Sequence, residues 1–270
     1  TRYISVTGVQ TCALPIYSAT IIAMVSDRRF VAAAAVSALS GLVRGFAGFG
    51  SALIYMPLVA AIYDPRIAAI TLLLVDFCGS TPFTIPEFRR CDWNEVIPIA
   101  VTTAIAVPFG TMALLWVDPI VLRWGIAVLV LGLLAALVAG WRFHERPGPA
   151  VTVGVGLFAG FGAGAVQIAG PAVIIYWLSR AANAAKMRAN LMTYFAISGA
   201  VLIVSYIVQG IFTAEGVLLS VLLGIPYLAA IGIGTYFFHG SSEITYRRVA
   251  YVIIMLAAVL SLPVFDGLLR

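Results

Sequence analysis

Apolar segments about 20 residues long recur along nearly the whole sequence, and short charged turns separate them. A helix needs about 20 apolar residues to cross a bilayer, whereas a transmembrane β-strand shows about ten residues of alternating polarity. Only 10% of the 270 residues are charged and 62% are hydrophobic, so polar side chains cannot cover a soluble globule of this size. The pattern predicts an all-α, polytopic membrane protein.

The distribution of charge favours a membrane protein over a nucleic-acid-binding one. The formal net charge is +5, but the Lys and Arg residues occur singly or in pairs between apolar segments. Lys and Arg mark cytoplasmic loops in this way, and there is no basic stripe interleaved with aromatic residues. The three cysteines and two histidines lack the spacing of a metal site or a disulfide framework. We therefore expect no nucleic-acid partner, no metal and no cofactor.

The first residues differ from the rest of the sequence. Val6–Ile16 resembles a common sequencing-library adapter translated in frame, and Gln10 and Pro15 interrupt the apolar core that a signal peptide would need. We interpret residues 1–17 as a non-native segment and expect the native chain to begin near Met24. A short native tail outside the cytoplasm is the alternative.

The sequence repeats itself. In each half a glycine-rich segment interrupts an apolar run, and a proline follows seven residues after its last glycine: Gly50 and Pro57 in the first half, Gly164 and Pro171 in the second. Such internal duplication is common in secondary transporters, whose substrate sites lie where the repeats meet.

The duplication predicts two transmembrane repeats, residues 24–146 and 150–270, on either side of a loop rich in proline and glycine. We expect each repeat to contain a helical hairpin, broken at Gly45–Gly50 or at Gly160–Gly164, and then about three transmembrane helices.

Loop charges predict an orientation if each broken segment returns to the side on which it starts. The basic loops then share one face, which the positive-inside rule makes cytoplasmic: Arg89/Arg90, Arg142/Arg146, Arg180/Lys186/Arg188 and Arg247/Arg248. Each half adds three further crossings, an odd number, so the two repeats are inverted in the membrane. If each broken segment crosses once instead, the basic residues divide evenly and predict no orientation.

The glycine segments carry the strongest functional signal. Irregular backbone inside a membrane is tolerated where it is buried in protein or lines a cavity, and a helix that restarts there points free N–H groups and its positive dipole end inward. Two such starts that face each other predict a site for a small anion, formed by Gly48, Gly50, Ser51, Gly162 and Gly164. The alternative is that these glycines serve only close helix packing.

Four other polar residues are candidates for the same site. Arg44 could neutralise a substrate anion or extend to the membrane surface. Gln167 and Asn190 could donate hydrogen bonds to an oxyanion or to a neighbouring helix. Asp76 lies in the middle of a predicted span, where an acid faces a cavity or a partner, so it could bind a coupled proton or pair with Arg44.

The glycine-rich break with a proline seven residues later, present in both halves as Gly45–Pro57 and Gly160–Pro171, resembles the sulfite exporter TauE/SafE permeases. The resemblance covers about residues 30–265. It implies a multi-pass carrier of the bacterial inner membrane, with sulfite, sulfoacetate or related organosulfur anions as candidate substrates. The first motif has Phe49 and Ser51 where further glycines are typical.

Three classes of function remain. A secondary transporter of small anions, with export favoured, agrees with the duplication and the glycine breaks. A passive anion channel or a membrane scaffold without transport is the alternative. An intramembrane enzyme is disfavoured because His144 and His239 fall in loops and no HExxH or GxSxG motif is present, and no GxxxxGK[ST] motif supports direct ATP coupling. The sequence indicates a lipid bilayer and a small anion as partners, and leaves the coupling ion and the oligomeric state open.

Overall fold

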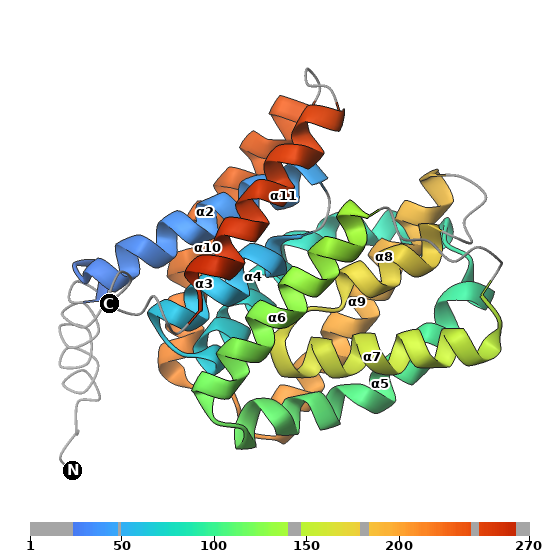
Figure 1. Cartoon of the computed structure of the whole chain (residues 1–270), viewed down its shortest axis with the longest axis horizontal. Coiled ribbons are helices and arrows are strands. Elements are labelled where there is room, and N and C mark those ends of the chain that lie inside the picture. The colour runs from blue at the N-terminus through green and yellow to red at the C-terminus, as the bar shows by residue number, and fades with distance from the viewer. Residues whose placement is uncertain (1–23, 48–49, 140–146, 179–183, 239–242, 263–270) are drawn as a thin grey trace, which may run out of the picture.

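Ten α-helices make up the described part of the chain. The computed structural model describes residues 24–47, 50–139, 147–178, 184–238 and 243–262, and these residues contain no β-strand (Figure 1). The helices are α2 (Arg28–Ala47), α3 (Ser51–Ile62), α4 (Pro65–Thr84), α5 (Trp93–Trp116), α6 (Pro119–Val138), α7 (Pro149–Val166), α8 (Gly170–Leu178), α9 (Ala184–Val208), α10 (Ala214–Phe238) and α11 (Glu243–Leu260), and the 3-10 helix η1 (Ile85–Arg89) follows α4. The predicted all-α architecture is confirmed.

Many of the exposed side chains on five of the helices are large and hydrophobic. Helices α5, α6, α7, α9 and α10 each contain a stretch long and apolar enough to cross a membrane. Large hydrophobic side chains on these helices point outward: Trp116 on α5 is 79% exposed and Ile225 on α10 is 67% exposed. Apolar surface of this extent needs a lipid environment. The chain is therefore a multi-pass membrane protein, as predicted.

The residues at the turns explain where several helices begin. The carboxylate of Asp64 accepts a hydrogen bond from the backbone N–H of Arg66 at 2.8 Å, and Pro65 occupies the first position of α4. Asp92 caps α5 in the same way, accepting from the backbone N–H of Asn94 at 3.1 Å. Such caps satisfy N–H groups that have no partner inside the helix.

The segment formed by α2 and α3 returns to the side on which it starts. Tyr63, the residue after α3, is near enough to the residues that precede and begin α2 for their charges to act on it: burial raises the pKa of Tyr63, Asp27 raises it further, and Arg29 lowers it. Glu215, at the start of α10, also raises this pKa.

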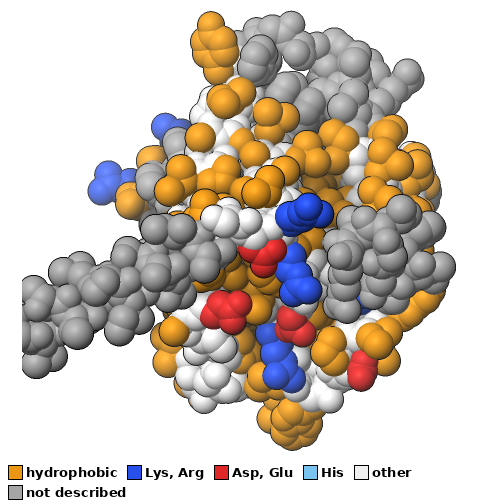
Figure 2. Space-filling view, turned by 90° about the vertical axis from the view of Figure 1, so that its left-hand side faces the viewer, with side chains coloured by type: hydrophobic (Ala, Val, Ile, Leu, Met, Phe, Trp, Pro, Cys, Tyr) orange, Lys and Arg blue, Asp and Glu red, His pale blue; other side chains and the backbone are white. Residues whose placement is uncertain are grey.

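Figure 2 views the left-hand side of Figure 1 and shows side chains of both charges gathered among hydrophobic ones.

The segment formed by α7 and α8 is a second hairpin. The hydroxyl groups of Thr152, in the first turn of α7, and Tyr176, near the end of α8, are 2.8 Å apart and form a buried hydrogen bond. Each of the two segments, α2–α3 and α7–α8, therefore returns to the end of the bundle at which it starts.

The break in the second half lies later than the sequence predicts. Helix α7 continues through Gly160–Gly164 to Val166, and the chain leaves the helix at Gln167, whose φ is 59°. Glycine weakens a helix by about 1 kcal/mol relative to alanine, but close packing of α7 against α5 favours glycine at these positions. The predicted break at Gly160–Gly164 is thus wrong, and the interruption between α7 and α8 spans residues 167–169.

Two pairs of helices pack with their backbones in contact, and each pair joins the two halves of the chain (Figure 1). A Cβ atom added to Gly41 or Gly45 of α2 would overlap the carbonyl oxygens of Tyr227 and Ile231 of α10. On the other side of the bundle, a Cβ atom at Gly160 or Gly164 of α7 would overlap the carbonyl oxygens of Thr103 and Val107 of α5.

Equivalent positions in the packed helices of the two halves are separated by a constant interval. Gly41 and Gly160 are 119 residues apart, as are Gly45 and Gly164. The same interval separates the first residues of α3 and α8, Ser51 and Gly170, and those of α4 and α9, Pro65 and Ala184. The glycine–proline motifs of the sequence are only 114 residues apart, so the packed helices follow a register five residues longer than the motif suggests.

Candidate functional site

A cavity of about 100 Å³ lies between the two backbone breaks. Its wall includes Gly50–Leu53, at the start of α3, and Gln167–Pro171, at the start of α8. Helices α4 and α9 contribute further wall residues, the latter with Phe195 and Ser198. The chain thus brings together in one cavity two segments that are more than 100 residues apart in sequence.

The backbone around this cavity suits a negatively charged ligand. Gly50 has φ 94°, a conformation that glycine adopts without strain, and it turns the chain into the first turn of α3. Helices α3 and α8 both begin at the cavity, and the first N–H groups of a helix have no partner within it. The positive ends of two helix dipoles therefore meet at one place, which is an anion-binding geometry.

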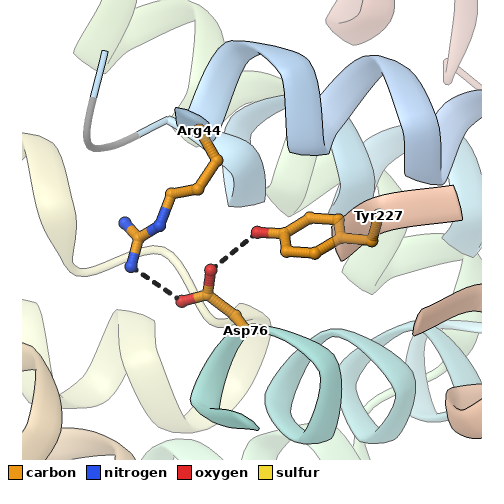
Figure 3. Close-up of polar contacts among 3 residues, drawn as sticks. All are labelled: Arg44, Asp76 and Tyr227. Atoms are coloured by element: carbon orange, nitrogen blue, oxygen red, sulfur yellow. Dashed lines mark hydrogen bonds and ion pairs between the residues drawn. The ribbon is translucent and has the colours of Figure 1, made fainter. Parts of the chain in front are cut away.

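Three side chains from three helices form a polar network at the wall of this cavity (Figure 3). A guanidinium nitrogen of Arg44, in the last turn of α2, is 3.1 Å from Oδ2 of Asp76 on α4. The hydroxyl of Tyr227 on α10 donates to Oδ1 of the same carboxylate at 2.6 Å. The ion pair between Arg44 and Asp76, one of the two roles predicted for Asp76, is confirmed.

The network is partly buried, which strengthens it. The side chains of Arg44 and Asp76 are 14% and 29% exposed, and the Arg44 guanidinium also lies over the ring of Phe195, 5.9 Å from its centre. A buried charge without a partner costs several kcal/mol, so each ion here depends on the other. Both carboxylate oxygens of Asp76 accept from donors, as an ionised carboxylate does.

Ser51 and Gln167, two other predicted residues, also lie at the cavity. Ser51 is the first residue of α3 and is 3% exposed. Gln167 ends α7, and its side-chain Nε2 donates to the carbonyl of Ala69 on α4 at 2.9 Å and to the hydroxyl of Tyr206 at 3.4 Å. The amide of Gln167 therefore ties the second break to α4 and α9.

Gly162 and Gly164 do not line the cavity. Gly164 packs against α5, as described above, and a Cβ at Gly162 would lie 2.6 Å from the carbonyl oxygen of Ile168. Close packing against another helix, the alternative role considered for these glycines, accounts for Gly164, whereas Gly162 packs against the backbone of the break itself. Gly48 lies outside the described residues.

Asn190 lies away from the cavity, near the start of α9. Its Oδ1 accepts from the backbone N–H of Asp92 at 2.7 Å, and its Nδ2 donates to Oε2 of Glu95 at 3.0 Å. The side chain is fully buried. Asn190 thus joins α9 to the first turn of α5, which is the helix–helix role that the sequence left as an alternative.

Two residues of this site were missed by reasoning from the sequence. Tyr227 follows Pro226 in an apolar helix, and Phe195 lies in another, so neither differs from an ordinary core residue. Tyr227 is recognisable only when α10 is known to cross α2, and Phe195 only when α9 is known to face Arg44.

No cluster of three His, Cys, Asp or Glu side chains that could hold a metal ion occurs among the described residues. The two described cysteines are not in a disulfide: Cys78 is exposed on α4, and Cys91 is buried in the loop before α5. The described part of the site consists of helix ends, one ion pair and neutral polar groups.

Comparison with known proteins identifies the family. The family model for the sulfite exporter TauE/SafE matches residues 33–261, which include all ten helices wholly or in part. No curated protein and no solved structure matches the chain. The match covers most of the sequence and agrees with the multi-pass helical architecture. This chain therefore belongs to the sulfite exporter TauE/SafE family of membrane transporters.

Proposed function

We propose that this protein is a secondary transporter that carries small anions such as sulfite or organosulfonates across the bacterial inner membrane, with export as its direction. The observation that carries the proposal is the meeting of two helix N-termini, those of α3 and α8, at one cavity beside Arg44. The two positive dipole ends favour an anion, the Arg44 guanidinium supplies hydrogen-bond donors, and the size of the cavity, about 100 Å³, suits a small anion.

The proposed substrate-binding residues are Arg44, Gly50, Ser51 and Gln167, which line the cavity. Their polar groups come from elements of both halves of the chain. Secondary transporters bind their substrates at such repeat interfaces and expose the site alternately to either side. Asp76 remains the candidate for ion coupling, because it is the acidic residue among the described residues that line this cavity.

Inverted repeats, residues 24–146 and 150–270, are part of the proposal. Contacts between helix ends support it. The start of α4 meets the end of α5, where Arg66 donates to the carbonyl of Leu114 at 3.4 Å. The start of α6 meets the end of α11, where Arg123 donates to the carbonyl of Ser261 at 3.0 Å.

These contacts agree with helices that cross in alternation. The starts of α5 and α9 meet through Asn190 at the opposite end, where the exposed Arg89 and Arg90 also lie. The positive-inside rule would make this end cytoplasmic.

The test is saturable flux of labelled sulfite into proteoliposomes that contain the chain from Met24 onward, with unlabelled sulfonates as competitors. A carrier gives flux that saturates with sulfite concentration and that competitors suppress. A passive channel gives flux that rises linearly with concentration. No flux above that of empty liposomes, with insertion verified, would reject sulfite as the substrate.

A further inference from the structure

Two ionised side chains line the cavity among the described residues, and their charges cancel. Arg44 contributes one positive charge and Asp76 one negative charge, and they are paired at 3.1 Å. The N-termini of α3 and α8 each add about half a positive charge. The cavity therefore presents a net charge of about +1 to a ligand.

The duplication of the chain did not duplicate this ion pair. With the 119-residue register, Ala163 on α7 corresponds to Arg44, and Phe195 on α9 corresponds to Asp76. Both Ala163 and Phe195 line the cavity, so the equivalent positions face the same space without carrying charge. The Arg44 guanidinium contacts both the Asp76 carboxylate and the ring of Phe195, the residue that occupies the corresponding position in the other half.

We infer that Asp76 is a specificity-determining residue, which compensates Arg44 so that the site takes a monovalent oxyanion and rejects a divalent one of the same size. An anion with one negative charge neutralises the two helix ends. A second negative charge on the anion would be left without compensation in a partly buried cavity, and such a charge is costly. The inference rests on the proposed function, because it concerns the ligand of that site.

Methanesulfonate and sulfate are suitable probes. Both are small tetrahedral sulfur oxyanions, and their charges, one and two, stay fixed over the neutral pH range. Sulfite itself takes up a proton near neutrality, so it serves only as the labelled reporter. The measurement is the ratio of the inhibition constants of the two probes against saturable sulfite flux in proteoliposomes at one pH.

The wild-type protein should bind methanesulfonate at least about tenfold more tightly than sulfate. Asp76→Asn removes the negative charge that pairs with Arg44 and raises the site charge by one unit, so the preference should shift toward sulfate by about tenfold or more. Arg44→Gln lowers the site charge by one unit and should strengthen the preference for methanesulfonate over sulfate. The double variant Arg44→Gln/Asp76→Asn restores the wild-type charge and should restore the wild-type ratio.

Two control variants separate charge from structure. Asp76→Glu keeps the carboxylate and should keep the preference for methanesulfonate. Glu87→Gln removes an acid that pairs with Arg90 at 3.7 Å, outside the cavity, and should leave the ratio unchanged. If Asp76→Asn does not insert into the membrane, the opposite shift in Arg44→Gln still tests the inference.

The outcomes distinguish the two proposals. The inference is overturned, and the proposed function stays intact, if sulfite flux saturates but the ratio of inhibition constants is the same in wild type, Asp76→Asn and Arg44→Gln. A wild-type protein that prefers sulfate also overturns it. If no probe inhibits and no sulfite flux saturates, the proposed function fails and the inference fails with it.

Discussion

The hydroxyl of Tyr227 on α10 donates to the carboxylate of Asp76 on α4, with 2.6 Å between the two oxygen atoms. This bond joins the second half of the chain to the first at the candidate anion site. Because the acceptor carries a charge, the bond should stabilise the fold more than a bond between two neutral groups does.

Removing this hydroxyl should therefore cost more stability than removing a neutral one. Tyr227→Phe should lower the free energy of unfolding by about 2 kcal/mol. The matched control is Tyr55→Phe, since the buried Tyr55 hydroxyl bonds the hydroxyl of Thr71 at 2.9 Å and should contribute about 1 kcal/mol. Unfolding of the purified variants in detergent measures both. Equal losses would show that the charge of Asp76 does not strengthen the bond.

Gly164 should tolerate no side chain. A Cβ atom there would overlap the carbonyl of Val107 and lie 2.8 Å from the backbone nitrogen of Thr111, so α7 and α5 would have to separate. Gly164→Ala should destabilise the protein by about 1–3 kcal/mol. On the same helix, Gly154 is exposed and has open space at its Cβ position, so Gly154→Ala should be neutral or stabilising by up to about 1 kcal/mol. Thermal unfolding gives the melting temperature of each variant. Equal changes in melting temperature for Gly164→Ala and Gly154→Ala would contradict the packing role of Gly164.

A negative charge at position 167 should repel the substrate. Gln167→Glu puts a carboxylate at the wall of the cavity, and the KM for sulfite should rise at least about tenfold. Gln167→Met is the control, because it has a similar shape and also loses the hydrogen bond to Ala69 but adds no charge. Proteoliposome flux over a range of sulfite concentrations gives both KM values. Similar values for the two variants would mean that residue 167 does not sense the charge of the anion.

The contacts of Asn190 favour a role in stability. Asn190→Ala removes its bonds to the backbone of Asp92 and to Glu95, and should lower the free energy of unfolding by about 1–3 kcal/mol with little change in the KM for sulfite. Asn94→Ala, which changes an exposed residue in the same turn of α5, should have little effect on either quantity. A raised KM with unchanged stability would instead assign Asn190 to substrate binding.

Composition and periodicity were enough to predict the helical membrane architecture, because the length of an apolar helix is fixed by the thickness of a bilayer. The repeated glycine–proline motif predicted that the two breaks meet, and the position of Asp76 inside an apolar span predicted that it could pair with Arg44. The position of the second break was not predictable in the same way. Glycines such as Gly160 and Gly164 indicate either an interrupted helix or a tightly packed one, and the choice depends on the partner, α5.

The role of Tyr227 also depends on contacts that the sequence does not contain. A tyrosine in an apolar helix is consistent with a core position, a membrane interface or a ligand site. Its meaning follows from the crossing of α2 and α10, which brings its hydroxyl to a carboxylate 151 residues away. Tertiary contacts of such long range leave no local pattern in the chain.

The glycine contacts have a consequence for motion. Helices α2 and α10 touch backbone to backbone, as do α5 and α7, and tightly packed interfaces of this kind move as rigid bodies rather than deform. Each pair takes one helix from each half of the sequence. If this protein works by alternating access, two mixed units would rock against each other, and the units that move would not coincide with the two halves of the sequence.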